Sequence, residues 1–143
     1  MIKYYSAWFC PFAHRATLAL EFHGLKYEWI EALGWEKRDA SGEENFDAQE
    51  RKDWWYHWKH QDLLKANPEG MVPTLVAEDG RVATESITCL QVIDAIGRSK
   101  TRRLLDVEDP WSVAKHQNWA AKVNKTCCSE YYSVLVREDE REE

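Results

Sequence analysis

The first 31 residues constrain the fold most, because a strand, a helix and a second strand pattern follow one another there. Residues 2–6 form a short, β-prone segment rich in Tyr. From Phe12 to His23, apolar residues recur at helical spacing, and Gly24 supplies a natural helix stop. Residues 27–31 alternate apolar side chains with carboxylates, which is typical of a half-buried strand. A helical crossover leaves the two strands parallel, so the chain opens with the βαβ unit of an α/β fold.

Three further helices are predicted along the chain. The first runs from Asp47 to Ala66, around a stretch rich in aromatic residues. The second is capped by Thr84 or Ser86, carries an apolar stripe and ends at Gly97. Pro110 opens the third, because proline is favoured in the first turn of a helix. The apolar face of that third helix has no evident partner in the rest of the sequence.

A hairpin lies between the first two of these helices. After a turn at 67–70, residues 74–77 form a short strand. Asp79-Gly80 then turns the chain back through residues 81–83, because Asp-Gly readily adopts the positive φ angles of a tight turn. The element order is therefore βαβ, α, ββ, α, and the charged residues 98–110 form a linker before the last helix.

Composition narrows the class of protein. A chain of 143 residues is long enough for one domain with an appendage, and 44% apolar residues with eight Trp predict a compact core. The net charge of −6 argues against nucleic acid, which is bound by clustered Lys and Arg. No apolar run reaches the roughly 18 residues that would cross a membrane, so we expect a cytoplasmic protein that binds neither nucleic acid nor membrane. The four Cys lack the spaced pairs of a zinc site, so we expect reduced thiols and no metal.

Cys10 is the candidate nucleophile. It lies in the turn between the first strand and the first helix, where unpaired amides and the helix dipole favour a thiolate, and His14 and Arg15 add positive potential. Three residues later, where a dithiol redox protein has its second cysteine, this chain has Ala13. A soluble thiol such as glutathione would therefore have to resolve any disulfide on Cys10. Position alone leaves open a second interpretation, that Cys10 is a small buried apolar residue.

The remaining cysteines are interpreted as structural. Cys89 falls within the apolar stripe of its helix and is expected in the core. Cys127 and Cys128 follow one another in the last helix with no activating partner.

Three motifs resemble the omega class of glutathione transferases. From Phe9 to Arg15 the chain has Cys-Pro-Phe-Ala followed by a polar residue and Arg, a motif that the lambda class and intracellular chloride channel proteins largely share. Residues 67–75 are similar to the segment that these families place before their third strand. Thr84-Glu85-Ser86 is similar to their Glu-Ser pair. Because the motifs occur in the family's order, the chain is identified as a member of this family.

The resemblance implies a thioredoxin-like βαβ-α-ββα domain with a mixed four-stranded sheet over residues 1–97, a linker at 98–110, and an incomplete all-α domain at 111–143. Only the first helix of the family's all-α domain has a counterpart. In the family, the remaining helices build the electrophile pocket and much of the dimer interface. We therefore expect a fragment or a truncated form.

The resemblance also implies how glutathione is bound, as a co-substrate. In the family the Val-Pro peptide is cis, and the valine backbone pairs with the cysteinyl part of glutathione. The Glu-Ser pair holds the γ-glutamyl end, and a lysine before the Asn-Pro turn meets the glycyl carboxylate, for which Lys59 is the first candidate and Lys65 the second. The site residues implied for this chain are catalytic Cys10 and the glutathione-binding residues Phe12, Lys59, Val72, Pro73, Glu85 and Ser86.

The stretch from Gly34 to Trp58 departs from the family pattern by its polar and aromatic length. Trp54, Trp55 and Trp58 could line the mouth of an active site, although packing of a helix onto the sheet is the simpler interpretation. His57 and His60 have helical spacing for a metal, but a solvated face is the more ordinary role.

The sequence thus predicts an omega-like glutathione transferase that forms a mixed disulfide at Cys10. We expect thioltransferase or dehydroascorbate reductase activity on a small electrophile or disulfide substrate, and the resemblance allows a homodimer. The alternative is a non-catalytic interaction module of the same fold, or a truncated inactive form.

Overall fold

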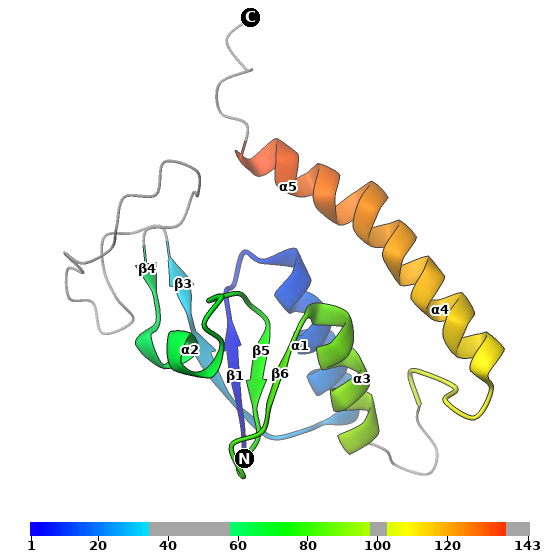
Figure 1. Ribbon diagram of the computed structural model, residues 1–143, viewed down its shortest axis with the longest axis horizontal. Helices are drawn as coiled ribbons and strands as arrows, with labels where there is room; N and C mark the ends of the chain where they lie inside the picture. The colour runs from blue at the N-terminus through cyan, green and yellow to red at the C-terminus, as the bar shows by residue number, and fades with distance from the viewer. Residues whose placement is uncertain (35–57, 98–102, 137–143) are drawn as a thin grey trace, which may run out of the picture. The chain divides into compact units, whose positions relative to one another are not determined.

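A four-stranded mixed sheet forms the centre of the first part of the chain. The computed structural model describes residues 1–34, 58–97 and 103–136, and divides into two compact units, Met1–Arg103 and Leu104–Glu143. In the first unit the strand order is β2-β1-β5-β6 (Figure 1). Neighbours β1 and β2 are parallel, whereas the other two pairs are antiparallel, which confirms the expected mixed sheet. The strands are β1 (Ile2–Ser6), β2 (Tyr27–Glu31), β5 (Thr74–Val76) and β6 (Val82–Thr84).

Helix α1 (Pro11–His23) makes the crossover that leaves β1 and β2 parallel. Its buried side includes Ala13, Ala16 and Ala19, whose small side chains let the helix lie close to its neighbours. The helix stops at Gly24, which has a φ of 60° in the left-handed region that glycine tolerates best. The predicted βαβ unit and its stop signal are therefore confirmed.

Helices cover the sheet on both faces, because successive residues of a strand point to opposite sides. Tyr4 is fully buried in a cluster with residues of α1 and α3 (Ser86–Ile96), two helices that lie side by side (Figure 1). Tyr5 belongs to a second cluster, which contains Leu63 of α2 (Gln61–Ala66). Cys10 is part of that second cluster.

Buried polar groups fix α1 in place. His23 Nε2 and Asp94 Oδ1 are 2.9 Å apart, and their side chains are only 1% and 3% exposed. The hydroxyl of Tyr4 donates to the Ala13 carbonyl at 2.6 Å and accepts from the Ser6 hydroxyl at 3.1 Å. The contacts of Ala13 and His23 thus join both ends of α1, which begins directly after Cys10, to neighbouring elements.

The predicted helix from Asp47 to Ala66 is confirmed at residues 61–66, which form α2, but is wrong at residues 58–60. Trp58–Lys59 is a strand, β4, which pairs antiparallel with β3 (Leu33–Gly34) in a separate two-stranded sheet. The His60 amide also donates to the Ala32 carbonyl at 2.9 Å, so backbone pairing with a distant segment overrides the local helical pattern. Helix α2 begins only at Gln61. Residues 47–57, including Trp54, Trp55 and His57, lie outside the described residues.

In the second unit, residues 110–136 form a continuous helical stretch, made of α4 (Pro110–Val123), a π-helical turn (Asn124–Cys128) and α5 (Ser129–Val136). Pro110 occupies the first turn as predicted, and Asp109 caps the helix by accepting from the Trp111 amide at 3.0 Å. No side chain of α4 or the π-helical turn is buried within the described part of the chain. Cys127 is exposed, so it belongs to no core there.

A search of the described residues for membrane spans finds no helix that combines the necessary length and hydrophobicity.

Candidate active site

Cys10 is the N-cap residue of α1, with Pro11 in the first turn after it. Its amide donates to the Ala7 carbonyl at 2.9 Å, and its carbonyl accepts from the His14 amide at 3.1 Å. The side chain makes no capping hydrogen bond and is 4% exposed. Because the first amides of a helix have no intrahelical acceptor, this position provides positive potential for a thiolate. The predicted placement of Cys10 between the first strand and the first helix is confirmed.

The loop before Cys10 is held at the backbone of Trp8. The Trp8 amide donates to Glu31 Oε1 at 3.0 Å, and the Trp8 carbonyl lies 2.9 Å from His14 Nε2. Glu31 also accepts from the indole of Trp29 at 3.1 Å. Glu31 and His14 therefore fix the peptide two residues before the candidate nucleophile. Trp8 and Glu31 carry no local signal for this role, because the contact joins segments 23 residues apart.

The Val72–Pro73 peptide is cis, as the resemblance implies. Val72 is 8% exposed and belongs to the same buried cluster as Cys10, so the fold brings these two candidate site residues together. Asn67 holds the preceding turn: its amide nitrogen donates to the Met71 carbonyl at 3.2 Å and to Thr74 Oγ1 at 3.1 Å. The sequence indicates a turn here, but not this bracing role of Asn67.

Glu85 and Ser86 lie at the start of α3, which confirms that this pair precedes a helix. The prediction that Thr84 or Ser86 is the cap residue is wrong. Glu85 is the N-cap residue, its side chain makes no capping hydrogen bond, and its φ of 68° is unusual for a non-glycine residue. Such a conformation costs about 1–3 kcal/mol and tends to persist where function requires it. Ser86 Oγ accepts from Arg15 Nη1 at 2.9 Å.

Of the two lysine candidates, Lys59 lies against the turn that precedes the cis peptide. Its Nζ donates to the Glu69 carbonyl at 3.0 Å. Gly70 has a φ of 63°, and a Cβ there would come within 2.6 Å of the Lys59 side chain. A side chain at position 70 would therefore displace Lys59.

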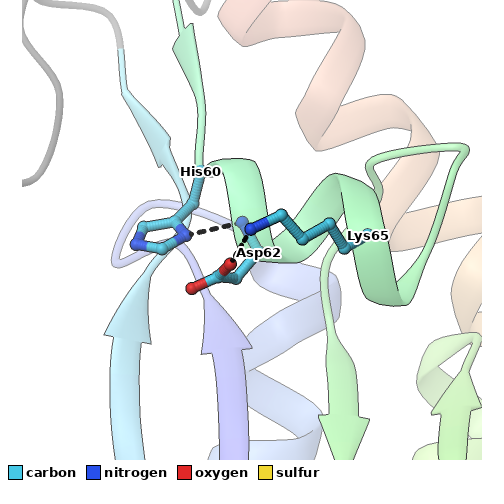
Figure 2. A network of polar contacts seen from close by, with 3 residues as sticks. All are labelled: His60, Asp62 and Lys65. Atoms are coloured by element: carbon cyan, nitrogen blue, oxygen red, sulfur yellow. Dashed lines mark hydrogen bonds and ion pairs between the residues drawn. The ribbon is translucent and has the colours of Figure 1, made fainter.

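Lys65, the second candidate, is bound to Asp62 at 2.8 Å, an ion pair between two exposed side chains (Figure 2). This hydrogen bond lowers the pKa of Asp62 and raises that of Lys65. Figure 2 also shows that His60 Nδ1 accepts from the Asp62 amide at 3.1 Å, so His60 caps α2. No group of three or more potential metal ligands lies within the described ranges.

Phe12 and Cys89 complete the set of predicted residues. Phe12 is partly buried against the cluster that contains Cys10, and the Arg15 guanidinium carbon lies 5.3 Å from its ring centroid. Cys89 is fully buried in the other cluster, which confirms its expected core position. Burial raises the pKa of the Cys89 thiol to about 12, and the nearby Glu85 carboxylate adds to the shift. Cys89 therefore stays protonated and unreactive at neutral pH.

Comparison with known proteins decides the family. The family model described as glutathione S-transferase, N-terminal domain, matches residues 9–96. The chain belongs to the glutathione S-transferase family. This match and the observed topology agree with the expected thioredoxin-like fold.

Relatives of this glutathione S-transferase chain include plant and omega-class proteins. It is 32% identical over 120 residues to a probable glutathione S-transferase BZ2 of Zea mays, a match that covers 80% of this chain and 42% of that protein. It is 29% identical over 117 residues to glutathione S-transferase omega-1 of Mus musculus, with coverage of 81% and 38%. The chain thus spans about two fifths of the length of these relatives.

The fold of the chain is also similar to that of a solved glutathione transferase. The glutathione transferase Omega 3C of Trametes versicolor matches with a TM-score of 0.63 and 25% identity, over 87% of this chain and 43% of that one.

Proposed function

We propose that this chain is the glutathione-binding part of an omega-like glutathione transferase that exchanges thiols through a mixed disulfide on Cys10. The observation that carries the proposal is the placement of Cys10 at the start of α1, in one buried cluster with Val72 of the cis peptide. Glutathione would be held by Phe12, Lys59, Val72, Pro73, Glu85 and Ser86. Residues 1–97 would form the glutathione-binding domain, with 98–110 as the linker to an all-α domain that begins at 111.

The proposed reaction has two disulfide exchanges. First, the Cys10 thiolate attacks the glutathionyl sulfur of a glutathione-containing disulfide, a Cys10–glutathione bond forms, and the other sulfur leaves as a thiolate that takes up a proton. The thiolate of a second glutathione then attacks the glutathionyl sulfur, which releases the Cys10 thiolate and yields oxidised glutathione. Ala13 stands where a resolving cysteine would be, so the second step depends on the soluble thiol. The proposal also includes reduction of dehydroascorbate as an activity. It further includes a cytoplasmic location and assembly as a homodimer.

Intact-mass measurement after incubation with oxidised glutathione tests the proposal. Because Cys127 is exposed, the starting protein should carry Cys127→Ser and Cys128→Ser, so that an adduct reports on Cys10. We expect one glutathionyl group per chain, removed by reduced glutathione, and none after Cys10→Ser. An adduct that survives Cys10→Ser, or no adduct in either protein, would refute the assignment.

A second candidate, a non-catalytic interaction module, is favoured by one observation. The Cys10 side chain is only 4% exposed, as expected for a residue that serves packing. The same mass measurement separates the two candidates, because a packing cysteine forms no adduct while the protein is folded.

A further inference from the structure

The chain enters α1 through a β-turn at residues 7–10. The Cys10 amide donates to the Ala7 carbonyl at 2.9 Å, which is the hydrogen bond that closes such a turn. Both end residues of the turn are buried. The closing bond uses neither the amide nor the carbonyl of Trp8, the second residue of the turn. These two groups are therefore available to partners from other parts of the chain.

Two different elements supply those partners. Glu31, the last residue of β2, accepts from the Trp8 amide through Oε1 at 3.0 Å. His14 of α1 has its Nε2 at 2.9 Å from the Trp8 carbonyl oxygen, and because a carbonyl only accepts, Nε2 must carry the proton. Both the neutral Nε2–H tautomer and the imidazolium have this proton, so the contact does not depend on the charge of His14. A strand and a helix thus hold the backbone of Trp8 from two sides.

The carboxylate of Glu31 is itself oriented by its neighbours. Its Oε2 accepts from the indole nitrogen of Trp29 at 3.1 Å, two residues earlier on the same face of β2. The Trp29 ring lies edge-on to the ring of buried Tyr4, with 5.2 Å between the centroids. The Tyr4 hydroxyl donates to the Ala13 carbonyl of α1. The carboxylate that meets the Trp8 amide is therefore linked through two aromatic side chains to the helix that begins after Cys10.

The position of the turn decides where the sulfur of Cys10 lies. Pro11 has no amide proton, so the first amides that α1 can offer to the sulfur are those of Phe12 and Ala13. The favourable potential of a helix start falls off within one turn. A reacting atom that is misplaced by about 1 Å can lose about a hundredfold in rate. Contacts that hold the turn should therefore affect the reactivity of the thiol.

We infer that Glu31 and His14 are positioning residues, which hold the turn at 7–10 so that the Cys10 sulfur stays beside the first amides of α1. The inference rests on the proposed function, in which Cys10 is the nucleophile. Both residues act through the backbone of Trp8. They therefore control how fast Cys10 reacts and leave the binding of glutathione to other parts of the site.

The rate at which oxidised glutathione modifies Cys10 tests this inference, followed by intact mass in the chain with Cys127→Ser and Cys128→Ser. We expect Glu31→Ala to lower this rate about tenfold. In the Cys10→Ser chain, the same change should leave the calorimetric affinity for reduced glutathione unaltered. Glu31→Gln keeps an oxygen for the Trp8 amide and should recover most of the rate. Glu28→Ala is the matched control, because it removes a carboxylate from the opposite face of the same strand and should leave the rate unchanged.

His14 provides a second test at an exposed position of α1. His14→Ala should slow the modification of Cys10 to a similar extent. His14→Gln has no charge but keeps an N–H donor for the Trp8 carbonyl, so it should recover the rate if the hydrogen bond matters and remain slow if only the charge matters. Because both residues hold Trp8, Glu31→Ala combined with His14→Ala should lose less than the product of the two single losses.

Three results would overturn the inference: unchanged rates in Glu31→Ala and His14→Ala, no recovery in the Gln variants, or a matching loss of glutathione affinity. Thermal unfolding shows whether each variant folds, and if Glu31→Ala does not, the His14 variants decide. If Cys10 forms no adduct in the chain with Glu31 and His14 intact, the proposed function fails and takes this inference with it. An adduct whose rate of formation is indifferent to both residues removes only the inference.

Discussion

Cys10 and Cys89 are both buried cysteines, yet the fold surrounds their sulfurs with different groups. Cys10 is the N-cap residue of α1, beside helix-start amides that have no acceptor within the helix. Cys89 lies one turn inside α3, and its sulfur is 3.5 Å from the Ala83 carbonyl oxygen and 3.8 Å from that of Pro73. Carbonyl oxygens favour the protonated thiol, whereas helix-start amides favour the thiolate. Burial and the nearby Glu85 carboxylate raise the pKa of the Cys89 thiol, so Cys89 is a core residue, whereas the helix start makes Cys10 the candidate nucleophile.

The largest expected effect is a difference in alkylation rate between these two thiols. A pKa of about 12 leaves about one Cys89 in 10⁴ ionised at pH 8. An ordinary thiol is roughly a quarter ionised there, so Cys89 in the folded protein should react at least ~10³-fold more slowly than Cys10. Timed iodoacetamide labelling followed by peptide mass spectrometry measures both rates in one sample.

Two controls make the labelling decisive. In denaturant, both cysteines should react at similar rates, because the fold no longer separates them. Cys127 provides an exposed reference thiol in the folded protein. Should Cys10 prove as slow as Cys89 in the folded state, Cys10 would be a packing residue and the non-catalytic module would be the better proposal.

Cys89 also makes the stability of the fold depend on pH. Its pKa is raised to about 12 in the folded chain, so above its unfolded value near 9 the unfolded chain binds fewer protons than the folded one. The contribution of Cys89 is therefore fully present below pH 9 and is lost as the pH rises toward 12, by up to about 1.4 kcal/mol per pH unit. Urea unfolding at pH 8 and pH 10 measures the change.

Cys89→Ala is the matched variant for this pH experiment. It creates a small cavity and is less stable overall, but its loss of stability between pH 8 and pH 10 should be smaller than that of the unchanged chain. Tyr27, whose hydrogen bond to Glu21 raises its pKa to about 12, titrates in both proteins, and its contribution cancels in the difference. Equal slopes for the two proteins would mean that the Cys89 thiol has an ordinary pKa.

The sequence predicts the parts of this site that depend on local patterns. The βαβ opening, the stop at Gly24 and the β5–β6 hairpin follow from spacing and turn residues, and all are present. The contacts that orient the site join distant segments, such as Glu31 with Trp8 and Arg15 with Ser86, and no local periodicity encodes them. The helix predicted through Trp58 and Lys59 failed for the same reason, because these residues pair with β3.

The smallest expected effect is a change in the free energy of unfolding at the residue that begins α3, the helix of Cys89, compared with the residue that begins α1. Cys10 begins α1 with an ordinary φ of −84°, whereas α3 begins at Glu85 with a φ of 68°. Glycine accepts that conformation without the cost of about 1–3 kcal/mol, although it loses about 0.5–1 kcal/mol to the greater freedom of the unfolded chain. Glu85→Gly should therefore raise the free energy of unfolding by about 1 kcal/mol, measured by urea denaturation. Glu85→Ala keeps the strained backbone and should give no gain. If glycine is no more stable than alanine at this position, the start of α3 is unstrained; if it is more stable and glutathione affinity also falls, the strain is retained because Glu85 contributes to the ligand site.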